Sequence, residues 1–170
     1  MKTSNITVLP YDAKWAIEFE KIKTELVEAL ANSCICIEHV GSTSVAGLSA
    51  KPIIDIDVVI PDYDCFETVV ERLAMIGYVH EGDLGIKDRE AFKYTGKEHL
   101  MKHHLYVCPE NSEELRRHII FRDYLRTHND AVSEYSQVKE QASLLYPHDI
   151  DSYIDYKGPF IKKIYQQCGL

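Results

Sequence analysis

The sequence predicts a single α+β domain, residues 1–170, in which a small sheet is followed by helices. Segments of strand-like composition fall within about residues 1–110, whereas about 111–170 shows helical periodicity throughout. No internal repeat or low-complexity linker divides the chain, and 170 residues suffice for one core. We therefore expect a small mixed or antiparallel sheet flanked by helices, with the C-terminal helices closing a cleft.

The first expected helix covers residues 12–31. Trp15, Phe19 and Ile22 recur at helical spacing and would form its buried stripe. Asp12 has the side chain of an N-cap residue. This helix should cover the sheet that follows it.

Glycine and proline mark the ends of the next elements. The Gly41-Ser42 turn ends the first strand, Pro52 precedes the second, and Gly77 ends the helix that Asp62 begins. The expected strands are 34–40, 53–60, near 78–81, 90–95 and 101–108, and the later helices are about 63–76, 112–128, 130–146 and 150–167. This order of elements places most strands before most helices.

Charge and hydropathy exclude several classes of function. The formal net charge is −8, from 19 Lys and Arg against 27 Asp and Glu, which argues against broad nucleic-acid affinity. No segment approaches the roughly 20 apolar residues of a membrane span. The N-terminus has no apolar signal core, so we expect a cytoplasmic protein.

The five cysteines are an odd number for a disulfide framework. Cys34 and Cys36 alternate along one expected strand and cannot pair with each other. We expect all five to be reduced thiols, and a zinc site would need a tighter Cys and His cluster.

Two acids interrupt the apolar strand 53–60. Asp55 and Asp57 share one face of this strand because successive side chains alternate. At roughly 7 Å and an effective dielectric near 20, their carboxylates repel by about 2 kcal/mol. A bound divalent cation would relieve this repulsion. The alternative is a pair of solvated acids on an edge strand.

The Gly41-Ser42 turn lies upstream of these acids. Glycine lets backbone amides approach a phosphate, and the Ser42 hydroxyl could hold phosphate oxygens. Lys51 stands just before Pro52 and is either a solvated residue at the strand entry or a further phosphate ligand.

A Gly-Ser turn followed by an Asp-x-Asp strand resembles the nucleotidyltransferase superfamily with the DNA-polymerase-β-like core. The run HVGSTSVAGLSAKPIIDI looks like the signature of the GrpB-like family, and the resemblance continues through 103–107, 121–125 and 153–161. It implies transfer of a nucleotidyl group from a nucleoside triphosphate to a small-molecule or protein acceptor. It also implies Mg²⁺ or Mn²⁺ on Asp55 and Asp57, and phosphates at Gly41 and Ser42.

The strand 101–108 departs from the superfamily pattern because no third carboxylate is found there. His104 and Tyr106 share one face of that strand. His104 could be a general base, a metal ligand or a hydrogen-bonded structural histidine. The missing acid supports an alternative function, a non-catalytic module that binds a nucleotide or phosphate ligand. A metal-dependent hydrolase is a third interpretation.

Cations on apolar helical stripes are the remaining candidates. Arg122, Lys139 and Lys157 lie among apolar neighbours, and Arg89 matches an arginine common in the family's hairpin. Each could form an internal salt bridge or snorkel to solvent, or together they could hold an anionic ligand across the cleft. The many tyrosines of the C-terminal helices fit core packing, and one of them could stack on a base.

Overall fold

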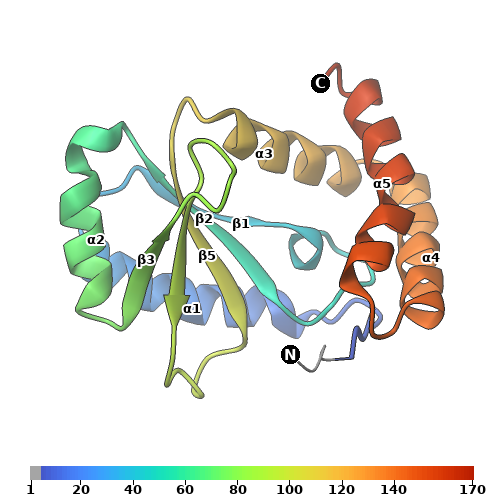
Figure 1. Ribbon diagram of the computed structural model, residues 1–170, viewed down its shortest axis with the longest axis horizontal. Coiled ribbons are helices and arrows are strands. Elements are labelled where there is room, and N and C mark those ends of the chain that lie inside the picture. The colour runs from blue at the N-terminus through green and yellow to red at the C-terminus, as the bar shows by residue number, and fades with distance from the viewer. Residues whose placement is uncertain (1–4) are drawn as a thin grey trace.

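A five-stranded sheet forms the centre of the computed structural model, which describes residues 5–170 (Figure 1). The strands are β1 Cys36–Val40, β2 Ile54–Ile60, β3 Tyr78–Gly82, β4 Glu90–Tyr94 and β5 His103–Pro109, in the order β1-β2-β5-β4-β3. β2 and β5 run parallel, and the other neighbours are antiparallel. The sequence predicted a mixed or antiparallel sheet, and the structure shows the mixed one.

Within residues 5–170, five α-helices pack around this sheet. They are α1 Lys14–Leu30, α2 Phe66–Ala74, α3 Glu113–Arg126, α4 Asn129–Leu145 and α5 Ile150–Gln167, with short 3₁₀ turns at Ser42–Ser44 and Tyr63–Cys65. The bounds differ from the sequence expectation by only a few residues. One detail was wrong: the N-cap position of α1 is Ala13, and the Asp12 carboxylate accepts a hydrogen bond from the Lys14 amide beside it. None of the described helices is long and apolar enough to cross a bilayer.

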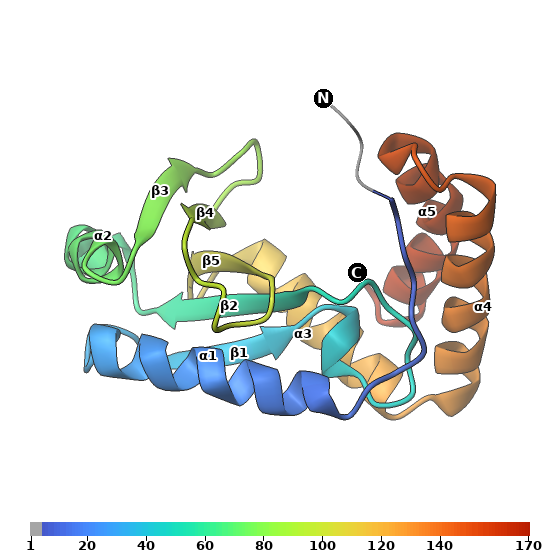
Figure 2. The same ribbon diagram turned by 90° about the horizontal axis from the view of Figure 1, so that it is seen from below.

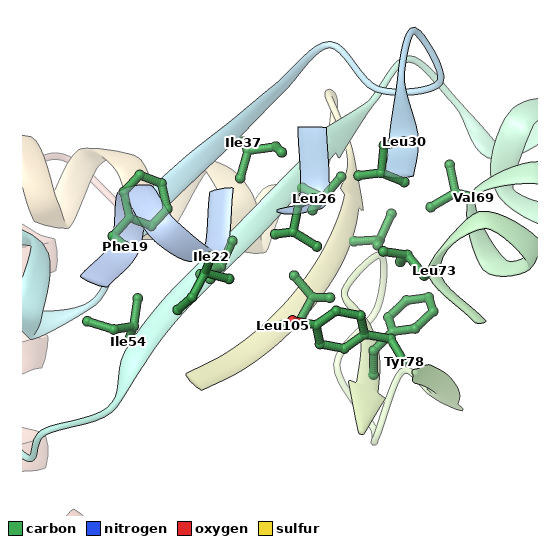
Figure 3. Close-up of a cluster of buried hydrophobic side chains, with 14 of the residues drawn as sticks. Phe19, Ile22, Leu26, Leu30, Ile37, Ile54, Val69, Leu73, Tyr78 and Leu105 are labelled. Carbon is green, nitrogen blue, oxygen red and sulfur yellow. The ribbon is translucent and has the colours of Figure 1, made fainter. Parts of the chain in front are cut away.

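α1 and α2 cover one face of the sheet and form the main core (Figure 3). Ile22 and Leu26 of α1 are fully buried against Ile54 and Leu105 of the sheet. Each such side chain stabilises the fold by about 1.5–3 kcal/mol relative to exposure. This packing directs Ile54, Ile56 and Val58 inward, so Asp55 and Asp57 face the other side.

That other side is covered unevenly. Leu115 of α3 packs on Val59 and Cys108, at the ends of β2 and β5. α4 and α5 pack together beside the sheet, and Val45 and Leu48 of the segment between β1 and β2 dock into them. Figure 2 shows α4 and α5 standing opposite the β3–β4 hairpin. The start of β2, with Asp55, therefore lies at the side of the sheet that faces the C-terminal helices.

Candidate functional site

The parallel pairing of β2 and β5 places residues far apart in sequence side by side. Asp55 is the register partner of His104, and Asp57 of Tyr106, on the same face. His104 Nδ1 lies 3.0 Å from Asp55 Oδ1. An ionised carboxylate can only accept, so Nδ1 carries the proton and donates. The other ring nitrogen, Nε2, is left as an acceptor on a side chain that is 49% exposed.

Gly41 fixes the other side of Asp55. Its φ is +72°, a left-handed conformation that favours glycine. A Cβ built on it would lie 2.3 Å from Asp55 Oδ2, far inside van der Waals contact. No larger residue fits here, so this turn can follow β1 closely and bring Ser42 next to the acid.

A pocket of about 200 Å³ opens beside Asp55, and we call it the lysine pocket. Its floor comes from the sheet and the 41–53 segment, and its far wall from α4 and α5. The lining residues are Ser42, Thr43, Ala50, Lys51, Ile53, Asp55, His104, Lys139, Tyr153 and Lys157. The pocket thus joins most of the predicted site residues with Lys139.

Lys139 is the most deeply placed cation, with an exposed fraction of 3%. Its ammonium donates to Ser42 Oγ and, over 3.2 Å, to the Ser49 carbonyl, and it lies 4.4 Å from the centre of the Tyr135 ring. No carboxylate forms a salt bridge with it among residues 5–170. Burial, with Lys157 and Lys51 nearby, lowers its pKa well below the usual lysine value, although Asp55 opposes this.

Lys157 and Lys51 complete the positive charge. Lys157 lies 4.5 Å and Lys51 5.4 Å from the centre of the Tyr153 ring. Burial, then repulsion from Lys51, lowers the pKa of Lys157 to about 8, and burial also lowers the pKa of Lys51. Three lysine side chains therefore share one nearby carboxylate, Asp55, and a bound polyanion would stabilise their protonated forms.

Asp57 differs sharply from Asp55. Its side chain has no exposed surface, and its Oδ2 lies 2.6 Å from Nδ1 of His118 on α3. The other nitrogen of His118 lies 3.2 Å from Glu114 Oε1. Burial lowers the pKa of His118, but the two carboxylates outweigh it and raise this pKa to about 10, so the ring is charged. The fold itself therefore relieves part of the repulsion expected between the two acids.

Sequence reasoning missed His118. Glu114 and His118 are four residues apart on an expected helix, so their contact could have been anticipated. The contact of this helix with Asp57 could not have been anticipated, because it depends on how α3 packs on the sheet.

The structure places both predicted arginines outside the lysine pocket. Arg122 donates from Nη1 to Glu38 Oε2 over 2.7 Å and to the His39 carbonyl, and from Nε to Asp123. Arg122 therefore joins α3 to β1 through internal salt bridges, one of the alternatives considered for it. The Arg89 guanidinium lies 4.3 Å from the centre of the Tyr106 ring. A ligand-binding role for Arg122 and Arg89 stays a prediction and gains no support from their positions.

A metal ion fits this site only together with phosphate oxygens. The described residues contain no group of three His, Cys, Asp or Glu side chains that could hold one. Asp57 Oδ1 is nonetheless buried without a hydrogen-bond partner, the kind of atom that a cation would satisfy. Mg²⁺ is commonly bound by one or two carboxylates plus substrate phosphates. Asp55 and Asp57 match that donor set.

Sequence comparison identifies the family of this chain. A family model described as GrpB protein matches residues 5–167. The chain belongs to the GrpB family. The UPF0157 protein YqkA of Bacillus subtilis is 32% identical over 157 residues, which cover 92% of this chain and 45% of YqkA. The GrpB-family chain thus spans less than half the length of that relative.

Solved structures give the same family and a wider fold group. The crystal structure of GrpB from Enterococcus faecalis has a TM-score of 0.83 and 32% identity, covering 95% of this chain and 96% of that one. A cytoplasmic RNA terminal U-transferase has a TM-score of 0.57 and 16% identity, covering 79% of this chain and 42% of that one. The resemblance to the nucleotidyltransferase fold is therefore confirmed for this GrpB-family chain.

Proposed function

We propose that this chain binds a nucleoside triphosphate by its phosphates and transfers the nucleotidyl group to a small-molecule or protein acceptor. The observation that carries this proposal is the lysine pocket, where three cations and Ser42 stand beside Asp55. A triphosphate would supply the negative charge that the pocket lacks. The net charge of −8 favours an acceptor other than nucleic acid.

Mg²⁺ or Mn²⁺ would be held by Asp55 and by the unpartnered Oδ1 of Asp57, and when bound it would neutralise charge on the phosphates. Lys139 and Ser42 bind phosphate oxygens at the depth of the pocket, and Lys51 and Lys157 bind them nearer its mouth. Most of the catalytic contribution of these residues is position and electrostatics.

His104 is the candidate general base. Asp55 holds its Nδ1–H, so Nε2 can take the proton of an acceptor hydroxyl. The acceptor oxygen then forms a bond to the α-phosphorus, the bond from that phosphorus to the bridging oxygen breaks, and pyrophosphate leaves. Asp55 stabilises the imidazolium that forms.

Metal and nucleotide should bind together. In calorimetry, Mn²⁺ should bind weakly alone and at least tenfold more tightly with ATP present, because phosphates complete its ligand set. Asp55→Asn should remove most of this gain, whereas Glu67→Gln, which changes an exposed acid on α2, should not. Equal Mn²⁺ affinity for Asp55→Asn and the wild type would show that Asp55 holds no metal.

The base is tested by His104→Gln. Pyrophosphate release from each nucleoside triphosphate should fall by about 10²–10⁴-fold, the usual contribution of a general base, while nucleotide affinity is kept. His99→Gln, at an exposed histidine in the loop before β5, is the matched control. Full turnover in His104→Gln would remove this residue from the mechanism.

The second candidate function is a binding module without catalysis. Two observations favour it: β5 presents no acid to the site, and the charged His118 already neutralises Asp57. Such a module would bind nucleotides through the lysine pocket but release no pyrophosphate with any acceptor, small-molecule or protein. The same assays therefore separate the two functions.

A further inference from the structure

The aromatic rings around the lysine pocket already face cations. Tyr153, the only Phe, Tyr or Trp among the described lining residues, is 1% exposed and contacts both Lys157 and Lys51 through its ring. Tyr135 lies under Lys139 and stacks on Phe160 at 4.8 Å between ring centres. Neither ring has a free face for the base of a nucleotide.

The pocket is also too small for a whole nucleotide. Its volume of about 200 Å³ is below the 300–1,000 Å³ of a typical ligand site, so it suits the phosphates alone. The nucleoside would lie in one of two adjoining grooves, each of which shares His104 with the pocket.

The first groove, of about 510 Å³, runs from Lys51 and Ile53 toward the start of α5. Its described lining residues include no Phe, Tyr or Trp and are Asn5, Ile6, Thr7, Lys51, Pro52, Ile53, Lys102, His104, His148 and Ile150. Such a surface offers apolar contact, and the aromatic rings among its described lining residues are the imidazoles of His104 and His148.

The second groove, of about 660 Å³, lies along β4 and β5 and does contain aromatic residues. The Tyr94 ring stacks on His103 at 4.3 Å, and the Tyr106 ring carries the Arg89 guanidinium at 4.3 Å. Phe92 is 5% exposed and belongs to the core under α1 and α2. Each of these two tyrosine rings thus already packs one face against a neighbour from the protein.

We propose that this site selects its ligand by a chain of phosphates and does not discriminate among bases. The inference rests on the proposed phosphate-binding role of the lysine pocket. Stacking on an aromatic side chain is worth about 1–3 kcal/mol per base, and the rings of Tyr94 and Tyr106, already packed against His103 and Arg89, should contribute little of it. Inorganic tripolyphosphate should therefore be a good ligand.

The test is calorimetry of the full chain with tripolyphosphate, ATP, GTP, CTP and UTP in one Mg²⁺ buffer. We expect the four nucleotides to bind within about threefold of one another, and tripolyphosphate within about tenfold of them, because all five make the same phosphate contacts. Lys157→Met should weaken all five alike, by about tenfold or more, for the same reason. Lys162→Met, at an exposed lysine of α5, is the matched control and should change nothing.

A tenfold preference for one base, or for all nucleotides over tripolyphosphate, would overturn this inference and leave the phosphate site standing. Failure of all five to bind would overturn both the inference and the proposed function. Because the wild-type panel alone gives these outcomes, the result does not depend on how the variants fold.

Discussion

Lys139→Met should weaken tripolyphosphate and ATP binding by about 10- to 100-fold and at the same time stabilise the fold. Hydrogen bonds to charged groups are worth about 1.5–3 kcal/mol, and Lys139 is the deepest cation in the pocket. In the free protein, however, this ammonium is buried with Ser42 and the Ser49 carbonyl as partners and without a paired carboxylate. Replacing this buried amine, whose pKa burial lowers, with an apolar side chain of similar length should add on the order of 1–3 kcal/mol to the free energy of unfolding.

Two measurements on one protein check this expectation. Calorimetry with tripolyphosphate gives the affinity, and urea unfolding without ligand gives the stability. Lys162→Met serves again as the exposed control. A destabilised Lys139→Met protein with unchanged affinity would assign Lys139 to the structure of α4 and remove it from the site.

His118→Gln should destabilise the protein by about 3–5 kcal/mol, the cost of leaving a buried charge without its partner. Asp57 has no exposed surface, and His118 is its only salt-bridge partner within residues 5–170. Asp57→Asn combined with His118→Gln should recover a large part of the loss, because no buried charge then remains. Glu114→Gln should lower the free energy of unfolding by less, since Glu114 is partly exposed and contacts only Nε2 of His118.

The same pair predicts a pH dependence. The pKa of His118 is about 10 in the fold and near 6.5 in an unfolded chain. Because the folded value is raised, the stabilisation is complete below about pH 6.5 and is lost as the pH rises through about 10. Urea unfolding at pH 6, 8 and 10 should show this decline in the wild type and a shallower one in His118→Gln. Parallel curves would mean that His118 is not charged beside Asp57.

Much of the fold followed from local patterns. Alternation in strand 53–60 assigned Asp55 to one face, and Gly41, Pro52 and Gly77 marked where elements end. These signals are short-range, so a single sequence carries them. A mixed or antiparallel sheet also followed from the resemblance to the nucleotidyltransferase fold, and the structure confirms the mixed form.

The site was harder to predict because it depends on packing. Arg122 and Lys139 both lie on apolar stripes of expected helices, and nothing in their spacing separates them. Only the docking of α3 against β1 gives Arg122 a carboxylate in Glu38, and only the docking of α4 on the 41–50 segment brings Lys139 to Ser42. His104 and Asp55 are 49 residues apart in the sequence, and their contact likewise requires the register of β2 with β5.

The parallel pairing of β2 with β5 also bears on how the protein reaches its working form. Helices α1 and α2 and the β3–β4 hairpin are built from contacts between near neighbours in the chain, which form quickly. The pairing of Asp55 with His104 closes a long loop and must await the whole intervening segment. We therefore expect the acid–histidine pair to form late in folding. An engineer who transplants the Gly41–Asp57 segment alone would carry the acids without the geometry that gives them a role.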